Sequence, residues 1–322
     1  MKYLKIKNEI EKIISGLNPG DRLPTEADIT AKYNVSRITV RKALEILEKE
    51  GTVYRTQGAG TFAGGTVQKV CVVYSKNIDL YRDPFYGRLI NLLEKKLYNN
   101  KCIMQLMSID EDTDLSLINA DRIIIISQVT EKIFDLDIDK IILFEGEYRD
   151  RNCPAILSDE FSAGEDVCRY LHDKGADKIL FAGNSKYYSS RKRLEGIKHF
   201  AEKNNISVSV RETPMNRDGG KIAGEYAKTA GIKYIVCAND WLALGVIQTC
   251  KNMGMECPED ISVISFDNTY ISSVSVPPIT TVDLPIEEGV RLCVKEIKEH
   301  RKERKPSEIY LKARLIEKSS VK

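Results

Sequence analysis

The chain has 322 residues, of which 42% are hydrophobic and 30% charged, and its formal net charge is +2. This length favours two domains with ample apolar material for their cores, and the small net charge gives no whole-chain sign of a nucleic-acid or membrane partner. No apolar run, residues 123–126 included, approaches the roughly 20 residues that span a bilayer. Charges interrupt every apolar pair near the N-terminus, so we expect no signal peptide and a cytoplasmic protein.

The cysteines and histidines argue against metal and hydrolase chemistry. The eight cysteines form no CxxC pair, which predicts reduced, mostly buried side chains without disulfide or zinc roles. None of the three histidines lies near a motif, so zinc hydrolases and Ser-His-Asp enzymes are disfavoured. We therefore expect no catalytic residues, no metal and no cofactor.

The charge is unevenly distributed along the chain. Residues 1–62 contain eleven Lys and Arg against eight Asp and Glu, a net charge of +3, and the remainder of the chain has a net charge of −1. The first module is thus the more basic one, as expected of a module that binds DNA.

The first two helices are predicted from apolar spacing and capping residues. Apolar residues at helical spacing predict an amphipathic helix over residues 3–15, and Gly16 ends it. Thr25 and Asp28 have the spacing of a capping box, in which each side chain bonds the other residue's backbone N–H. They predict a short second helix ending near Tyr33.

The third helix carries the candidate DNA-reading residues. It is predicted to run from Ser36, as N-cap, to Glu50. Arg37 and Arg41 are four residues apart and so lie on one face near the N-terminal end of this helix. In a helix-turn-helix protein, that end of the recognition helix meets base edges and phosphates in the major groove.

A hairpin is predicted after the third helix. Strand-like residues 53–55 and 61–62 are joined by residues 57–60, which contain two glycines suited to a tight turn. Three helices followed by a hairpin describe a winged helix-turn-helix, a small α+β domain. We place this DNA-binding domain at residues 1–62 and a short linker at residues 63–69.

Residues 3–62 closely resemble the GntR family of bacterial transcription regulators. The resemblance depends most on residues 19–26 (PGDRLPTE), 35–41 (VSRITVR) and 57–62 (QGAGTF). It implies that six residues serve DNA binding: Arg37 and Arg41 by direct contact, Ser36 and Thr39 by supporting phosphate contacts, and Gln57 and Gly58 at the tip of the wing. The family often has an arginine where this chain has Ala27, which predicts one phosphate or base contact fewer.

From residue 70 onward the pattern alternates between apolar strands and amphipathic helices. Strands are predicted at 70–74, 102–107, 122–126, 140–144, 155–158, 178–182, 206–210, 234–237 and 261–266. Helices are predicted at 85–99, 162–174, 190–203, 218–229, 240–253 and 286–300. Repeated β-α units imply parallel sheets covered on both faces, and this many strands favours two sheets, hence a two-lobed α/β domain.

Polar and aromatic residues follow several of these strands. Ligands of such folds bind at the carboxyl ends of the strands, here between the two lobes. Carboxylates, an amide and a guanidinium can bind sugar hydroxyls, and an aromatic ring can stack on the apolar face of a sugar. The strand ends carry 83–86 (DPFY), Asp159, Ser189, Arg191, Arg193, 239–241 (NDW) and 267–268 (DN).

Residues 70–318 resemble the effector domain of the LacI family, which has the periplasmic-binding-protein-like fold. The clearest matches are 83–86, 193–196 (RLEG), 238–245 and 258–268. The resemblance implies effector contacts from Phe85, Tyr86, Asp159, Ser189, Arg193, Asn239 and Asp267. It also implies an effector-binding and dimerisation domain at 70–322, with an N-terminal lobe at about 70–158 and 282–303 and a C-terminal lobe at about 159–281 and 304–318.

Together the two modules resemble the arabinose-repressor subgroup of the GntR family. The resemblance implies a homodimeric repressor of carbohydrate-utilisation genes that binds a near-palindromic double-stranded operator. A small sugar, L-arabinose in the first instance, would release it. A ligand-dependent activator, a corepressor-type regulator, and another sugar or a nucleoside as effector stay open.

Two other classes of protein are disfavoured. A solute-binding protein for transport would need an export signal, and it would have no use for a winged helix. An enzyme acting on a sugar or nucleotide would need a phosphate loop, a metal-ligand set or a nucleophile–base pair, none of which the sequence shows.

Overall fold

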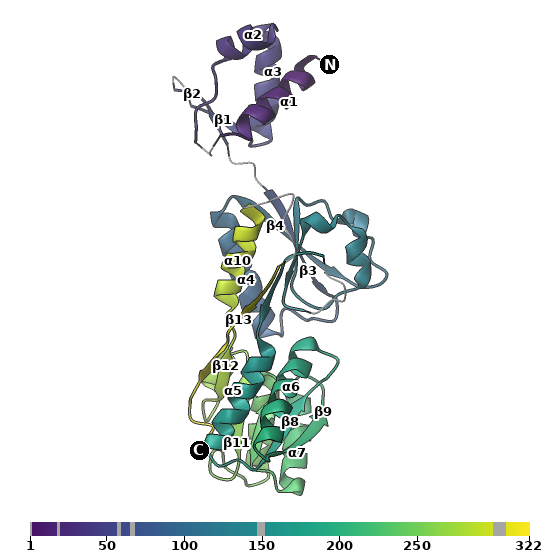
Figure 1. Cartoon of the computed structure of the whole chain (residues 1–322), viewed down its shortest axis with the longest axis vertical. Helices are drawn as coiled ribbons and strands as arrows, with labels where there is room; N and C mark the ends of the chain where they lie inside the picture. Colours follow the sequence, from purple (N-terminus) through teal and green to yellow (C-terminus); the bar gives the residue numbers. More distant parts are fainter. Residues whose placement is uncertain (1, 18–19, 57–58, 65–67, 147–151, 299–306) are drawn as a thin grey trace. The chain divides into compact units, whose positions relative to one another are not determined.

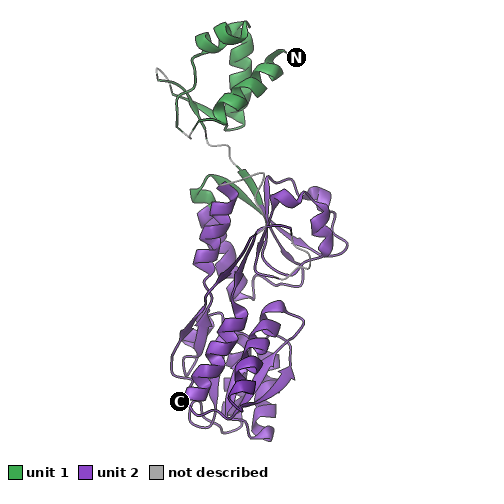
Figure 2. Cartoon of the chain, viewed as in Figure 1, with its two compact units in different colours: residues 1–70, 97–105 green, residues 71–96, 106–322 purple. Residues whose placement is uncertain are grey.

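A computed structural model describes residues 2–17, 20–56, 59–64, 68–146, 152–298 and 307–322. The chain divides into two compact units, residues 1–70 with 97–105 and residues 71–96 with 106–322 (Figure 2). No helix among the described residues is long and apolar enough to cross a membrane.

The N-terminal segment is the predicted winged helix-turn-helix (Figure 1). Its elements are α1 (Lys2–Ile14), α2 (Glu26–Tyr33), α3 (Arg37–Lys49), β1 (Val53–Thr56) and β2 (Gly60–Ala63). Apolar faces of all three helices meet in one core, in which Ile10, Val40 and Leu47 are fully buried. These residues recur at the helical spacing read from the sequence.

Local interactions explain where these elements begin and turn. The capping box is present, since the Thr25 N–H donates to Asp28 Oδ2 at 2.9 Å and the Asp28 N–H donates to Thr25 Oγ1 at 3.2 Å. Asn34 ends α2 in the left-handed conformation, with φ 50°. Gly60 has φ +118°, and a Cβ there would lie 3.0 Å from Nε of Arg22, so the hairpin requires glycine at this position.

The second module contains two six-stranded sheets. The sheet of the N-terminal lobe has the order β13-β7-β6-β5-β3-β4. Its strands are β3 (Gln68–Ser75), β4 (Cys102–Ile109), β5 (Arg122–Ile125), β6 (Ile141–Phe144), β7 (Ala155–Ser158) and β13 (Glu308–Leu311).

The sheet of the C-terminal lobe has the order β14-β12-β11-β10-β8-β9. Its strands are β8 (Lys178–Gly183), β9 (Ser207–Glu212), β10 (Tyr234–Cys237), β11 (Ser262–Phe266), β12 (Thr280–Asp283) and β14 (Arg314–Ile316). Its neighbouring strands are parallel except for β12 and β14, which are antiparallel. The predicted α/β fold with parallel sheets is therefore confirmed.

Helices accompany both sheets. The long helices are α4 (Pro84–Asn99), α5 (Glu160–Asp173), α6 (Tyr188–Lys203), α7 (Arg217–Ala230), α8 (Asp240–Asn252) and α10 (Ile286–Lys298), and α9 (Tyr270–Val274) is one short turn. Between β4 and β6 the chain forms β5 and, on either side of it, short 3-10 segments in place of long helices: η1 (Leu115–Leu117), η2 (Glu131–Asp135) and η3 (Ile138–Lys140).

Glycines set the close packing of α5 against α6, which lie side by side in Figure 1. A Cβ on Gly164 would lie 2.1 Å from the carbonyl oxygen of Arg193, and one on Gly196 would lie 2.0 Å from that of Phe161. Because each glycine faces the backbone of the other helix, the two helices approach closely at the turn of α6 that carries Arg193.

The C-terminal segment differs from the expected division into lobes. Residues 304–318 were expected in the C-terminal lobe, but β13 pairs in parallel with β7, with Glu308 opposite Ala155 and Leu311 opposite Ser158. Backbone pairing at the open edge of the N-terminal sheet therefore retains Glu308–Leu311 in the N-terminal lobe, whereas Arg314–Ile316 pairs with β12 in the C-terminal lobe, as expected. The chain crosses between the lobes three times, after β7, after β12 and after β13.

Candidate functional site

The start of α3 is organised by its own side chains. Ser36 precedes the helix, and its Oγ accepts a hydrogen bond from the Thr39 N–H at 3.3 Å and lies 2.8 Å from Thr39 Oγ1. The two hydroxyls thus satisfy part of the open first turn, where backbone N–H groups lack helical partners. Their predicted role at DNA phosphates stays a prediction.

Two arginines are presented on the exposed face of α3. Arg37 and Arg41 are both exposed, with 62% of the Arg41 side chain accessible, and Arg41 lies 3.5 Å from a carboxylate oxygen of Glu26. Between them in sequence, Ile38 is 80% exposed. Gln57 and Gly58, the predicted wing tip, lie outside the described residues.

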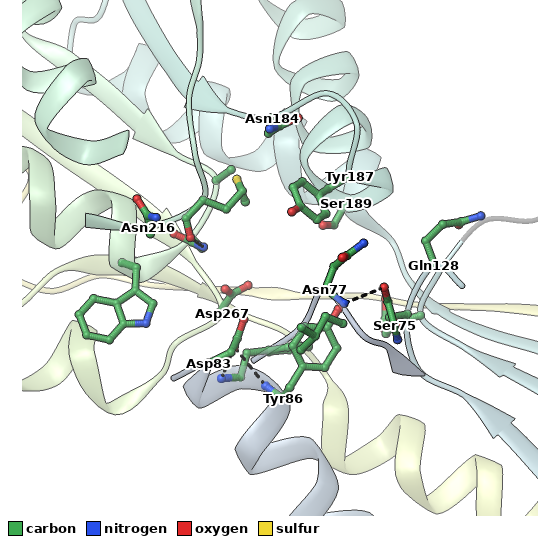
Figure 3. A pocket seen from close by; sticks show the side chains of 18 of the residues that line it. Ser75, Asn77, Asp83, Tyr86, Gln128, Asn184, Tyr187, Ser189, Asn216 and Asp267 are labelled. Atoms are coloured by element: carbon green, nitrogen blue, oxygen red, sulfur yellow. Dashed lines mark hydrogen bonds between the residues drawn. The ribbon is translucent and has the colours of Figure 1, made fainter. Parts of the chain in front are cut away.

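A pocket of about 1050 Å³ lies between the two lobes of the effector domain, at the carboxyl ends of their strands (Figure 3). Six of the seven predicted effector residues line it: Phe85, Tyr86, Ser189, Arg193, Asn239 and Asp267. Asp159 does not line it, because its carboxylate accepts a hydrogen bond from the Ser162 N–H at 3.0 Å and caps α5. The next residue, Glu160, lines the pocket instead.

Arg193 is bound by the protein itself. Its Nε and Nη2 each donate to one oxygen of Glu160 at 2.7 Å, its Nη1 donates to the Ala238 carbonyl at 2.5 Å, and its Nη2 also lies 3.4 Å from Asp267. Only 3% of the Arg193 side chain is exposed. Burial lowers the pKa of the guanidinium, but the carboxylates of Glu160 and Asp267 outweigh burial and raise it. Arg193 thus serves mainly to hold neighbouring residues of the pocket in place, and less to contact a ligand.

Four carboxylates form an acidic cluster in the pocket: Asp83, Glu145, Glu160 and Asp267. Burial raises the pKa of Asp83 and raises that of Asp267 well above its usual range, against the lowering effect of Arg193. Burial, followed by the charge of Glu160, raises the pKa of Glu145 to about 7. Figure 3 shows Asp83 and Asp267 next to Tyr86, and burial raises the pKa of that phenol as well.

Glu145 follows β6 with φ 61°, an uncommon left-handed conformation for a glutamate. Its Oε1 accepts hydrogen bonds from the Ser158 N–H at 3.0 Å and from the Ser158 hydroxyl at 2.7 Å. Ser158 therefore leaves the second oxygen, Oε2, to other donors. Neither Glu145 nor Glu160 was predicted, although both follow strands, the rule that selected Asp159.

Several other polar side chains line the pocket without having been predicted. They come from both lobes: Ser75, Asn77, Gln128, Asn184 and Asn216 (Figure 3). The predicted Asn239 is held in place, since its Oδ1 accepts from the Leu242 N–H at 2.9 Å and its Nδ2 donates to the Met215 carbonyl at 3.1 Å.

Trp241 joins the two lobes at the pocket. It lies in the first turn of α8, in the C-terminal lobe, and its Nε1 donates to the carbonyl oxygen of Arg82 in the N-terminal lobe at 3.1 Å. Trp241 is the one tryptophan in the sequence, so tryptophan fluorescence reports on the surroundings of this residue.

The arrangement suits binding of a small polar ligand. Carboxylates and amides offer hydrogen-bond acceptors and donors, and Phe85, Tyr86 and Trp241 offer apolar surface. Among the residues that the structure describes, no group of three or more His, Cys, Asp and Glu side chains could hold a metal ion.

Comparison with known families finds matches to two separate parts of the chain. Residues 2–63 match the family described as bacterial regulatory proteins, gntR family. Residues 168–321 match the family described as periplasmic binding protein-like domain.

Curated relatives match along nearly the whole chain. The arabinose metabolism transcriptional repressor of Geobacillus stearothermophilus is 26% identical over 356 residues, covering 100% of this chain and 98% of the relative. The repressor of the same name from Halalkalibacterium halodurans is 27% identical over 341 residues, covering 94% of this chain and 91% of the relative.

Solved structures share the fold of the effector domain. A LacI family transcriptional regulator from Enterococcus faecium with bound ribose superimposes with a TM-score of 0.70 at 22% identity, covering 79% of this chain and 98% of that one. The transcriptional regulator CelR in complex with cellobiose gives a TM-score of 0.69 at 19% identity, covering 89% and 91%.

Proposed function

We propose that this chain, which joins a GntR-type winged helix-turn-helix domain to a LacI-type, periplasmic-binding-protein-like effector domain, is a transcription repressor released from its operator by a small sugar. The observation that carries the proposal is the presence, on one chain, of an exposed arginine pair on α3 and a polar pocket between two lobes. A regulator of this kind works where the DNA is, in the cytoplasm.

DNA recognition is assigned to the exposed face of α3. Arg37 and Arg41 can each present two guanidinium nitrogens to a guanine edge or to a phosphate. Ser36 and Thr39 hold the first turn of α3, whose free N–H groups and positive dipole end favour a phosphate. Because the net charge of residues 1–62 is only +3, non-specific affinity should be modest and salt-sensitive.

A homodimer and a near-palindromic operator belong to the proposal. Two apolar side chains at the end of α9 and just after it are exposed: Val274 at 69% and Val276 at 79%. They support an interface between two copies of the C-terminal lobe, since such residues rarely gather on a solvated face. A two-fold dimer would place two copies of α3 on two related half-sites. Sedimentation of the wild type and of Val276→Asp tests this, with a dimer expected only for the wild type.

The sugar is proposed to act by closing the two lobes. The chain crosses between the lobes three times, which is compatible with a hinge, and the ligand would contact both sides of the pocket. Closure releases the operator only if the sugar binds the closed, DNA-incompetent state more tightly than the open one. The operator must then weaken sugar binding by the same factor.

L-Arabinose is the first candidate effector, because the two full-length relatives above are named as arabinose repressors. A thermal-shift panel of sugars on the full chain tests this directly. A sugar at about 1,000 times its dissociation constant stabilises the folded state by about 4 kcal/mol. A response to another sugar would retain the proposed mechanism and change the effector, whereas no response from any sugar would contradict sugar sensing. No turnover of the bound sugar is expected, and chromatography of the sugar after incubation checks this.

A further inference from the structure

The charge balance of the pocket restricts which sugars it can take. The acidic cluster brings together four carboxylates from four separate segments: the loop before α4, the residue after β6, the start of α5 and the residue after β11. Three of them, Asp83, Glu145 and Asp267, have raised pKa values because they are buried, and neighbouring carboxylates add to the effect. Each would gain from hydrogen-bond donors and lose from a further negative charge.

The buried guanidinium of Arg193 is already hydrogen-bonded to the protein. Nε and Nη2 form the paired edge with which an arginine grips a carboxylate or phosphate, and in Arg193 both bond to Glu160 at 2.7 Å. Nη1 is bonded to the Ala238 carbonyl. An incoming anion would therefore have to displace Glu160, whose side chain is 1% exposed, and leave that carboxylate buried without its partner.

Among the residues that the structure describes, the other cationic side chains that line the pocket are Arg82, Lys186 and Arg217, and all three are exposed. Solvent and salt screen exposed charges, so these side chains offset little of the repulsion from a buried carboxylate cluster. Burial and the charge of Glu160 oppose the ionisation of Glu145, whereas the two bonds from Ser158 and the charge of Arg193 favour it.

We propose that the effector is a donor-rich sugar without negative charge, either neutral or carrying an amino group, and that the acidic cluster excludes sugar phosphates and sugar acids. The proposal depends on sugar sensing, as argued above, and narrows its chemistry. Glu145 is the residue that sets the selectivity, because its Oε2 is left by Ser158 to receive a hydroxyl or ammonium donor.

Pairs of sugars that share a ring but differ in charge test whether the pocket excludes negative charge. Calorimetry on the full chain at pH 8, above the pKa of about 7 for Glu145, compares D-glucose with glucosamine, glucose 6-phosphate and gluconate, and compares L-arabinose and D-ribose with ribose 5-phosphate. For whichever parent sugar binds, we expect the phosphate or acid to bind at least about 100-fold more weakly, which corresponds to a few kcal/mol of like-charge repulsion. We expect glucosamine to bind no more weakly than glucose.

Two variants test the role of the cluster. At pH 8, where Glu145 is mostly ionised, Glu145→Gln retains the acceptor for Ser158 but removes the charge, and we expect it to narrow the affinity ratio between the parent sugar and its anionic derivative by about tenfold. Glu225→Gln makes the same change on the exposed face of α7 and should leave the ratio unchanged.

The outcomes distinguish the two proposals. A phosphate or acid that binds as tightly as its parent sugar, whether through the exposed cations or otherwise, would retain sugar sensing and overturn the exclusion of anions. If neither these probes nor any sugar of the thermal-shift panel binds, sugar sensing fails, and the inference fails with it. The wild-type panel decides the matter even if Glu145→Gln does not fold.

Discussion

Replacing Arg193 should destabilise the effector domain more than it alters a ligand contact. The side chains of Arg193 and Glu160 are 3% and 1% exposed, and two 2.7 Å bonds join them. Removing one partner of such a buried pair leaves the other charge uncompensated and costs about 3–5 kcal/mol. Domains are stable by about 5–15 kcal/mol, so Arg193→Met should lose about a fifth or more of the total.

The pair can be isolated with a double-mutant cycle. Glu160→Gln in the Arg193→Met background removes the carboxylate that has lost its partner. The double variant should therefore lose at least about 1.5 kcal/mol less stability than the sum of the two single losses. Arg82→Met removes an arginine whose side chain is 83% exposed and should cost less than about 0.5 kcal/mol.

Urea unfolding followed by Trp241 fluorescence measures each variant, because the one tryptophan lies in the lobe that holds Arg193. A loss below about 1 kcal/mol for Arg193→Met, or additive losses in the double variant, would refute the interpretation of this pair as a buried structural charge.

Three further predictions concern DNA, pH and packing. Arg37→Ala and Arg41→Ala should each weaken operator binding by about 1–3 kcal/mol in fluorescence anisotropy while the sugar-induced thermal shift stays unchanged; an intact affinity would exclude the arginine from the DNA contact. The pKa of Glu145 is raised to about 7 in the folded state, so its proton is held more tightly there and stability falls as pH rises from its ordinary value of 4.5 toward 7. Glu145→Gln should therefore raise the thermal midpoint at pH 8 relative to wild type and change it little at pH 4.5, and equal gains at both values would contradict this sign. Gly196→Ala should destabilise by about 1–3 kcal/mol or more in the same urea assay, since its Cβ would lie 2.0 Å from a backbone oxygen, whereas Gly16→Ala, with its nearest atom at 3.6 Å, should be tolerated.

The sequence predicted the DNA-binding domain well because its signals are local. The Thr25–Asp28 capping box, the Ser36 cap and the spacing of Arg37 and Arg41 each depend on residues within four positions of one another. Helical periodicity and capping then define the three helices to within one or two residues, and the same holds for most strands and helices of the effector domain.

The sequence predicted less where distant segments meet. Asp159 and Glu160 are neighbours after the same strand, and only the packing of α5 against α6 decides that Glu160 reaches Arg193 while Asp159 caps a helix. Glu145 is recruited through Ser158 on the adjacent strand, a pairing of β6 with β7 that no local pattern shows. The placement of β13 in the N-terminal sheet likewise depends on which sheet edge is open.

The central claim, that one ligand couples the pocket to the DNA-binding face, is tested by operator binding with and without sugar. The probe is a fluorescent duplex selected from a random pool by the full chain, and the ligand is the sugar that gives the largest thermal shift. Saturating sugar should weaken operator affinity by at least about tenfold, a coupling of about 1.4 kcal/mol, and the operator should weaken sugar binding by the same factor. Equal operator affinity in the presence and absence of a sugar that demonstrably fills the pocket would contradict the proposed mechanism.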